Sequence, residues 1–443
     1  MQVGLKAANI LGKLKKHPFF CKTKKPKNSM KKIYLSLISL FLFSALSAQV
    51  LDEFRSLNRD GIFDETGLLK SWPAEGPQLL WANESLLEGH SSMTFAYDKI
   101  YLTGIQDTLD VAIALDMQGN VLWQTPYGRA WMQSFPKSRS TPTIENEKIY
   151  VTSGVGDVAC LNALNGEIIW QVTASEDNAG TYGRWGIAES LLILDEKIFF
   201  TCGGPNTTMI ALNKETGETI WKTKTLNTNP SYSSAILIER DGKKIISNVT
   251  EKYIIGVNPE DGNILWEFSF DGYAQPPYHA NIHCNMPIYY DGKLFITSGY
   301  NHRNIMLELS KDLSKAYFVY TTDVLDTHHG GVVKIGDYVY GTNWENNRMG
   351  RWVCMDWNTG ETHYETEWIN KGSIIAADGM LYCYEEKTGN LALVPVNPEK
   401  FEIVSSFTIT QGNRGPFWSH PVIKDGILYI RHLNALMAYN LKQ

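Results

Sequence analysis

The sequence predicts an all-β protein, an eight-bladed β-propeller whose ring is closed by a strand from the N-terminal part of the chain. Two repeated patterns predict this fold. A short phrase that ends in tryptophan recurs with a period of roughly 45 residues, which is the length of one four-stranded propeller blade. A second pattern, an apolar strand that opens each blade, recurs eight times along the chain.

The phrase places a small residue, then Asp or Asn, then Gly, and finally Trp four residues after the Gly. The clean copies are ALDMQGNVLW, CLNALNGEIIW, ALNKETGETIW and GVNPEDGNILW, which end at Trp123, Trp170, Trp221 and Trp266. A Gly beside Asp or Asn provides the positive φ of a tight hairpin, and the β-branched and aromatic residues beyond it favour a strand. Degenerate copies end, by the same spacing, at Phe318, Tyr364 and Val404.

The eight opening strands give an independent count of the blades. They are SSMTFAYDKIYL, STPTIENEKIYV, AESLLILDEKIFF, SSAILIERDGKKIIS, NMPIYYDGKLFI, GGVVKIGDYVYG, GSIIAADGMLYC and SHPVIKDGILYI. The last blade ends at Gln443 before its outer strand, whereas GPQLLWANE, around Trp81, is a strand without a blade. We therefore expect the Trp81 strand to pair beside the C-terminal strands, which leaves no open sheet edge between first and last blade.

The chain of 443 residues is long enough for two or three domains, but its repeats run on without a linker, so we expect one. The content of 12% aromatic residues and 36 glycines suits many strands joined by tight turns. We expect four segments: a basic extension over 1–29, a signal peptide over 30–48, a lead-in over 49–76 and the propeller over 77–443.

The N-terminal segment has the pattern of a signal for export. Met30 begins MKKIYLSLISLFLFSALSAQ, in which two lysines precede an apolar run and small residues end at Ala48, the expected cleavage site. The run is too short for a membrane span, and no Cys follows it to carry a lipid anchor. Residues 1–29 are interpreted as translation from a misread upstream start. We expect a periplasmic or secreted protein.

The expected mature chain is acidic. Ten lysines and no acids lie before Gln49, so cleavage leaves 31 basic and 47 acidic residues, a net charge of −16. Such a balance excludes a nucleic acid or an anionic membrane as a charge-driven partner. Five cysteines remain, an odd and widely spaced set that is no disulfide framework. Cys160 and Cys354 stand in the small-residue place of the repeat and are expected in the core.

The repeated phrase resembles the repeat of the pyrroloquinoline-quinone (PQQ) propellers, which include quinoprotein alcohol dehydrogenases and BamB-type outer-membrane assembly factors. The resemblance covers the chain from about Phe54 to Gln443, and the segments RSLNRDGIFDETGLLKSWPAEGPQLLW and HHGGVVKIGDYVYGTN resemble secreted propellers of Bacteroidetes type. It implies that the repeated Trp docks between neighbouring blades. It names an architecture, and function still has to be argued from a site.

The sequence places a candidate site at the mouth of the central channel, just before the opening strands. Polar and aromatic residues gather there, as is typical of a small-molecule pocket. The predicted ligand-binding residues are Arg139, Arg184, Trp185, Glu189, His283, His329, Lys371, Trp418 and His420. Glu189 with Arg139 or Arg184 could orient a quinone, a sugar or a carboxylated ligand. The alternatives are that Glu189 only balances Arg184 and that the aromatic residues are packing lids.

The histidines do not predict a metal site from spacing alone. His328 and His329 are adjacent, and neighbouring side chains on a strand point to opposite faces, so one His is expected in the channel and the other in the interior. His279 and His283, with Cys284, match no recognised zinc pattern. Tyr278 lies in the same loop region at the channel mouth.

Two functions remain open. The first is a binding or interaction propeller, whose partner is a small polar ligand or another envelope protein. The alternative is a PQQ-dependent dehydrogenase that oxidises an alcohol or sugar with PQQ and Ca²⁺. The resemblance implies that such enzymes carry vicinal cysteines, absent here, and an Asp base, for which Asp326 is the nearest candidate. The binding propeller is favoured.

Overall fold

The computed structural model describes residues 51–276 and 282–443. The described residues belong to one compact unit, which is the propeller. The predicted extension over 1–29, the signal peptide over 30–48 and its cleavage at Ala48 lie outside the described residues, as do Tyr278 and His279. Within the described part of the chain, no helix is both long and apolar enough to cross a bilayer.

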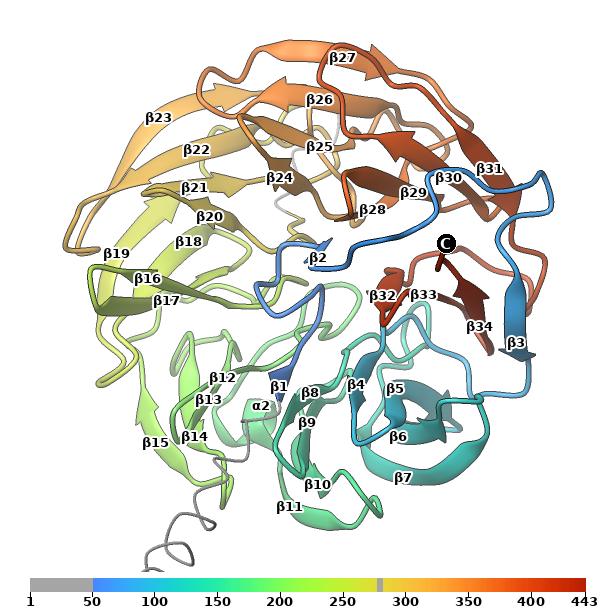
Figure 1. Cartoon of the computed structure of the whole chain (residues 1–443). Coiled ribbons are helices and arrows are strands. Elements are labelled where there is room, and N and C mark those ends of the chain that lie inside the picture. Colours follow the sequence, from blue (N-terminus) through green and yellow to red (C-terminus); the bar gives the residue numbers. More distant parts are fainter. Residues whose placement is uncertain (1–50, 277–281) are drawn as a thin grey trace, which may run out of the picture. The chain divides into compact units, whose positions relative to one another are not determined.

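Eight β-sheets surround one axis, which confirms the predicted fold and blade number (Figure 1). The first four blades consist of β4 (Thr94–Ala96), β5 (Lys99–Gln106), β6 (Leu109–Asp116) and β7 (Val121–Arg129); β8 (Thr143–Glu145), β9 (Lys148–Thr152), β10 (Val158–Asn162) and β11 (Ile168–Val172); β12 (Leu192–Leu194), β13 (Lys197–Phe200), β14 (Ile210–Asn213) and β15 (Thr219–Lys222); and β16 (Ile236–Arg240), β17 (Lys243–Val249), β18 (Tyr253–Val257) and β19 (Ile264–Ser269).

The remaining blades follow in the same order around the ring. They consist of β20 (Ile288–Tyr290), β21 (Lys293–Ile296), β22 (Asn304–Leu309) and β23 (Ala316–Thr322); β24 (Val333–Ile335), β25 (Tyr338–Thr342), β26 (Trp352–Asp356) and β27 (Thr362–Thr366); β28 (Gly372–Ala377), β29 (Met380–Glu385), β30 (Asn390–Pro395) and β31 (Ser405–Thr408); and β32 (Val422–Lys424), β33 (Ile427–His432), β34 (Ala435–Asn440) and β3 (Leu79–Asn83). A short helix, α2 (Ala174–Asp177), follows the second blade.

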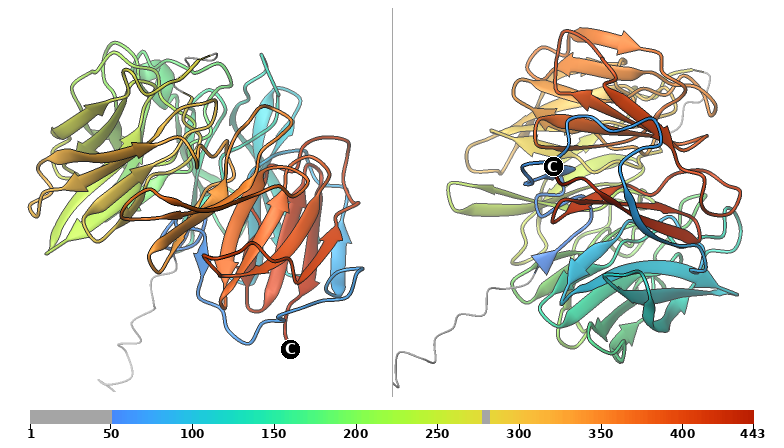
Figure 2. Two further views of the ribbon diagram at one scale, coloured as in Figure 1. Left: turned by 90° about the horizontal axis from the view of Figure 1, so that it is seen from above. Right: turned by 45° about the vertical axis from the view of Figure 1, so that its right-hand side comes forward.

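The eighth blade is completed by the N-terminal strand, as predicted. β3 pairs antiparallel with β34, so that Trp81 lies opposite Ala438 and Asn83 opposite Leu436. The pairing places segments from the two ends of the described chain side by side (Figure 1, Figure 2). Because the ring closes through backbone hydrogen bonds, the outer edge of β34 is covered.

Each repeated Trp packs against the hairpin turn of the next blade. The indole N–H groups of Trp81, Trp170, Trp221 and Trp266 donate to carbonyl oxygens of the following blade over 2.9 to 3.1 Å. The Trp170 ring also covers Gly217, where a Cβ would lie 2.6 Å from a ring carbon and where φ is +74°. Gly is therefore required in the phrase for its backbone conformation and for the approach of the Trp. Gly166 meets Trp123 in the same way.

Two degenerate copies of the phrase were assigned to the wrong residue. In the fifth blade Phe318 is 48% exposed, and Tyr320 occupies the Trp place: it lies opposite Met306, donates to the Trp357 carbonyl at 2.9 Å and covers Gly360. The turn before it is longer than in the clean copies, so a fixed spacing points to the wrong residue. In the seventh blade Val404 is likewise exposed, at 45%.

The first part of the lead-in segment crosses the centre of the ring (Figure 1). β1 (Leu51–Asp52) pairs with the inner strand of the second blade, and β2 (Ile62–Phe63) pairs in parallel with the inner strand of the seventh. We call residues 51–63 the plug. No sequence pattern predicted its position, because the segment has neither a repeat nor an opening-strand motif.

Two buried arginines fasten the plug to opposite sides of the ring. Arg55 donates to the carbonyl oxygens of Val332, at 2.8 Å, and Ile374, at 3.3 Å. Arg59 donates to the carbonyl of Ala235 at 2.9 Å and forms an ion pair with Glu53. Burial lowers the pKa of Arg55 to about 10, against a small opposing effect of Asp60, so the guanidinium stays charged at neutral pH. Charge-assisted hydrogen bonds to carbonyl groups thus satisfy backbone acceptors that face the axis.

Replacement of Trp170 by Ala is expected to lower the free energy of unfolding by about 3–5 kcal/mol, because a cavity forms between two blades. Urea unfolding measures the change. The matched control is Ile169→Ala, since Ile169 is the neighbouring residue and is 44% exposed. Equal stability of the two variants would contradict the inter-blade role of Trp170.

Arg55→Ala is expected to lower the free energy of unfolding by about 2–4 kcal/mol, because several inner carbonyl groups lose a charged donor while they stay buried. Lys70→Ala is the control from the same lead-in. The side chain of Lys70 is 47% exposed and pairs with Asp378 at the surface, so its loss should cost no more than about 1 kcal/mol. A similar small change for both variants would show that the plug is not held by Arg55.

Candidate functional site

A pocket of about 690 Å³ lies at the centre of the ring, with the plug on one side of it. Phe54, Arg55 and Arg59 of the plug line it, together with residues from the loops that precede the opening strands. Because these strands converge on the axis, residues far apart in sequence meet there. The pocket is also lined by His90, Phe135, Arg139, Arg184, Trp185, Tyr232, Cys284, Tyr300, His328, His329, Glu386, Trp418 and His420. We call this space the central pocket.

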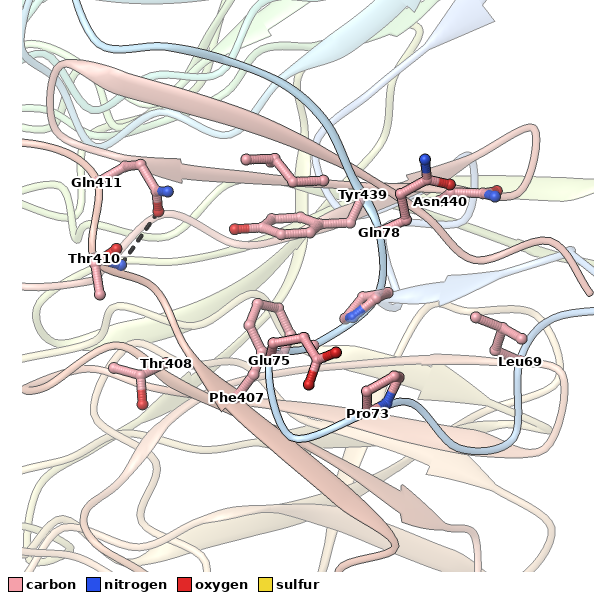
Figure 3. A pocket seen from close by; sticks show the side chains of 13 residues that line it. Leu69, Pro73, Glu75, Gln78, Phe407, Thr408, Thr410, Gln411, Tyr439 and Asn440 are labelled. Carbon is pink, nitrogen blue, oxygen red and sulfur yellow. Dashed lines mark hydrogen bonds between the residues drawn. The ribbon is translucent and has the colours of Figure 1, made fainter.

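A second pocket, of about 630 Å³, lies away from the predicted site residues (Figure 3). Its walls come from the lead-in near Pro73 and Gln78 and from Phe407 and Tyr439 of the last two blades. Its lining residues include one carboxylate, Glu75, and no Lys, Arg or His. The central pocket, with its cations and imidazoles, is therefore the better candidate for recognition of a ligand.

Aromatic rings form a nearly continuous wall around the central pocket. Trp185 contacts Tyr232 at 5.4 Å between ring centroids and stacks on Tyr300 at 6.3 Å. Tyr300 contacts His328, at 5.0 Å, and the wall continues through His329 to Trp418. Rings of this kind offer flat apolar faces to a ligand with a planar ring or a sugar face.

Two arginines that line the pocket, Arg139 and Arg184, add positive charge among these rings. The Arg139 guanidinium donates through Nη2 to the Phe135 carbonyl at 2.6 Å, whereas its buried Nη1 has no hydrogen-bond partner among the described residues. Burial, and secondarily the charge of Arg139, hold the pKa of His90 well below its usual range. Arg184 is exposed and lies 5.5 Å from the Trp185 ring. Two guanidinium groups therefore face a space lined by uncharged rings.

Hydrogen bonds to its neighbours determine the tautomer of His420. Arg55 Nη1 lies 2.7 Å from His420 Nδ1, and a guanidinium can only donate, so Nδ1 accepts. The Nε2–H group then donates to the His329 carbonyl at 2.9 Å. Burial and the Arg55 charge lower the pKa of His420 to about 3, so the imidazole is neutral at physiological pH. His420 thus links the plug to the loop that carries His329.

His328, His329 and Glu386 meet at one edge of the pocket. Glu386 Oε2 lies 3.5 Å from His329 Nε2 and 3.8 Å from His328 Nδ1, and the other carboxylate oxygen, Oε1, accepts from Lys371 Nζ at 2.9 Å. Burial alone would raise the pKa of Glu386, but His328, His329 and Lys371 together lower it to about 2. The carboxylate is therefore ionised although it is 7% exposed.

The expectation that His328 and His329 point to opposite sides is wrong. The two residues lie in a bend before β24 and not in a strand, and their ring centroids are 4.0 Å apart. Both rings line the central pocket. The rule of alternating faces does not hold where the backbone bends.

Of the predicted site residues, Arg139, Arg184, Trp185, His329, Trp418 and His420 line the central pocket. Glu189, His283 and Lys371 do not line it. Glu189 forms no ion pair with Arg139 or Arg184 in the described part of the chain; it accepts from the Thr201 N–H at 2.9 Å and from Asn248 Nδ2 at 3.1 Å. His283 is buried against Phe270 and contacts Ser298, and Lys371 lies behind Glu386.

The residues that sequence reasoning missed belong to turns and to the plug. Tyr300 lies between β21 and β22, and Glu386 lies between β29 and β30. Neither stands before an opening strand, so the pattern that located the other residues could not find them. Asp326, the candidate base, does not line the pocket. It accepts from the backbone N–H of Trp344 at 3.0 Å, and burial raises its pKa to about 8.

Comparisons with known proteins agree with the propeller. A family model described as outer membrane protein assembly factor BamB matches residues 108–366. An uncharacterized protein of Rickettsia conorii is 27% identical over 45% of this chain and 44% of its own length. Quinoprotein alcohol dehydrogenase PedH of Pseudomonas putida is 26% identical over 29% of this chain and 22% of its own length. The chain thus spans less than half of each of these curated relatives.

Two solved structures share the fold. BamB from Moraxella catarrhalis superimposes with a TM-score of 0.59 at 12% identity, over 82% of this chain and 100% of that protein. Quinohemoprotein alcohol dehydrogenase from Comamonas testosteroni superimposes with a TM-score of 0.61 at 12% identity, over 88% and 80% of the two chains. At this identity the likeness concerns the fold alone.

The environment of Glu189 generates a prediction about pH. Burial raises its pKa to about 7, so the folded protein holds a proton that the unfolded chain releases above its ordinary pKa near 4.5. This contribution to stability is complete below about pH 4.5 and is lost as the pH rises through 7. When the pH is raised from 5 to 8, the free energy of unfolding of Glu189→Gln, measured with urea, should therefore fall by about 2–3 kcal/mol less than that of the parent. Glu218→Gln is the control: Glu218 is exposed, so this variant should show the same pH dependence of stability as the parent. The same pH dependence in Glu189→Gln would show that Glu189 is ionised in the folded state.

Proposed function

This chain belongs to the PQQ-repeat family of propellers, whose matching model is described as outer membrane protein assembly factor BamB, and from that premise we propose that it is a binding module of the cell envelope. Its central pocket takes a small polar ligand that combines a planar ring, or a sugar ring, with an acidic group. The protein adds no chemistry of its own to this ligand.

The contents of the central pocket support this function most directly. A volume of about 690 Å³ falls in the range of about 300–1,000 Å³ that is typical of small-molecule sites. Trp185 and Trp418 offer ring faces, while Arg139 and Arg184 offer guanidinium groups. An unpaired polar atom such as Arg139 Nη1 is costly to keep in a buried place, and an anionic ligand would satisfy it. Arg pairs with a carboxylate through two parallel hydrogen bonds.

The proposed place of action is outside the cytoplasm. The N-terminal pattern of residues 30–48 is that of a signal peptide, and the family model describes an outer-membrane assembly factor. Another envelope protein is therefore a second class of partner, which would meet the rim of the propeller. The cations and rings gathered inside the pocket favour a small ligand over a protein partner for that site.

The alternative of a PQQ-dependent dehydrogenase fits the residues poorly. Such an enzyme needs a carboxylate base and carboxylate ligands for Ca²⁺ beside the quinone. Among the described residues that line the pocket, Glu386 is the single carboxylate, and Lys371 and two histidines already surround it. Asp326 accepts from backbone groups outside the pocket, and Cys284 stands without a second cysteine beside it. We derive no oxidation step for this chain.

A thermal-shift screen followed by calorimetry tests the proposed function. The screen contains aromatic and sugar acids, neutral sugars, and quinones, including PQQ with and without Ca²⁺. We expect acids with a ring to raise the melting temperature and the neutral analogues to have little effect, because only the acids can pair with Arg139 and Arg184. The double variant Trp185→Ala, Trp418→Ala should lose this binding by calorimetry.

The matched control is the double variant Tyr290→Ala, Phe318→Ala, since both rings are about half exposed, at 55% and 48%, and lie outside the central pocket. It should bind like the parent. If no compound shifts the parent, or if the control loses binding as much as the Trp variant, the ligand pocket is refuted and the protein-docking function takes its place.

A further inference from the structure

Three side-chain atoms at one edge of the central pocket have the types and spacing of metal ligands. They are His328 Nδ1, His329 Nε2 and Glu386 Oε2, and all of them lie within 4.8 Å of one another. The carboxylate oxygen is 3.5 Å from one imidazole nitrogen and 3.8 Å from the other. Ligands at about 2.0–2.1 Å from a tetrahedral Zn²⁺ are about 3.3–3.4 Å apart, so a small inward movement is enough.

The two nitrogen atoms are available as ligands. His328 Nδ1 and His329 Nε2 are buried and have no hydrogen-bond partner within the described part of the chain. Buried polar atoms of this kind are rare without a partner, and their common direction toward one carboxylate oxygen calls for an explanation. A cation placed among the three atoms would bind the carboxylate oxygen and accept a lone pair from each nitrogen.

Neighbouring groups hold these ligands in the orientation that a metal requires. His328 Nε2 lies 2.8 Å from the Tyr300 hydroxyl, so this nitrogen can carry the proton and leave the lone pair on Nδ1. Lys371 Nζ holds Glu386 Oε1 at 2.9 Å and leaves Oε2 facing the histidines. Metal-binding histidines typically use their second nitrogen in this way, and ligating carboxylates are hydrogen-bonded in turn.

We propose that His328, His329 and Glu386 form a site for a divalent transition-metal ion of the Zn²⁺ type, with a coordination position open to the central pocket. Two imidazoles and one carboxylate are the protein ligands of open zinc sites. Imidazole nitrogen selects a first-row transition ion over Mg²⁺ or Ca²⁺, which prefer oxygen ligands. The spacing of the sequence did not predict this site, because Glu386 comes from a different blade.

The charges around the site determine what occupies the open position. Glu386 contributes one negative charge, which Lys371 already offsets, so the charge of the ion stays largely uncompensated. An anionic oxygen from solvent or from a bound ligand is therefore the favoured fourth partner. The site goes beyond the proposed binding of an acidic ring compound, since the ion requires no organic ligand, but it adds a fixed positive charge where such a compound would bind.

Metal binding to the purified full-length protein tests the site. The protein is treated with a chelator, exchanged into chelator-free buffer and titrated with Zn²⁺ by calorimetry and with Co²⁺ by visible absorption. We expect one high-affinity ion per chain and the strong visible bands of four-coordinate Co²⁺. His329→Ala and Glu386→Gln should each weaken binding by at least about a hundredfold, since even a lost neighbour of a ligand costs 10- to 100-fold.

His363→Ala is the control, because His363 is exposed and belongs neither to the lining of the central pocket nor to the cluster. It should bind the ion like the parent. Glu386→Gln keeps an oxygen for Lys371, and His328→Asn serves as the second variant if His329→Ala does not fold by its melting curve. Absence of Zn²⁺ binding in the parent, or unchanged binding in the cluster variants, overturns the proposal.

The two proposals fail separately. The metal titration is carried out without any organic compound, whereas the ligand screen is repeated in the presence of a chelator. Loss of metal binding in Glu386→Gln with retained binding of an acidic compound supports a metal site apart from the ligand site. If the parent binds the metal ion but no organic compound, the metal site is supported and only the ligand pocket is refuted.

Discussion

The packing of a ring from one blade on the hairpin turn of the next is the contact on which this structure depends. Trp170 over Gly217 is a clear example, because the turn needs both a positive φ and a residue without Cβ. The indole N–H then reaches a carbonyl of the same turn, so one side chain fixes both the distance and the angle between two blades. The same contact recurs between successive blades, with Tyr320 in place of Trp in one degenerate copy, so the sheets are arranged around a common axis.

A ring of sheets leaves inner backbone groups facing the axis, and the plug supplies donors for some of them. Arg55 and Arg59 bind carbonyl oxygens on opposite sides, so the plug is tied across the ring by charged groups that are almost fully buried. The same arginines form one wall of the central pocket. The structure of the centre and the chemistry of the site therefore depend on the same two side chains.

Electrostatics divides the pocket into regions. Burial beside guanidinium groups keeps His90 and His420 neutral, whereas Glu386 is kept ionised by Lys371 and two histidines. The pocket thus combines guanidinium groups, neutral rings and one carboxylate at an edge. This asymmetry would orient a ligand that has an acidic end, and it places the carboxylate where two imidazole nitrogens meet.

The sequence by itself determined the architecture. The repeated Trp phrase and the opening strands predicted eight blades and the closing strand around Trp81, because both patterns express local geometry: a tight turn, a strand and a ring four residues after a Gly. It also located six of the residues that line the central pocket, since each of these lies in the loop before the inner strand of a blade. The spacing failed at Phe318, where a longer turn moved the Trp place to Tyr320.

Only the tertiary structure decided which side chains meet. Glu189 lies in a loop before an opening strand, as Trp418 and His420 do, yet its side chain binds Thr201 and Asn248. Lys371 pairs with Glu386 and does not line the pocket. A bend turns His328 and His329 to the same side, and a turn from another blade brings Glu386 to them. The plug has no repeat that would reveal its place. Local pattern fixes how the backbone runs, whereas the direction of a side chain in a loop depends on partners distant in the chain.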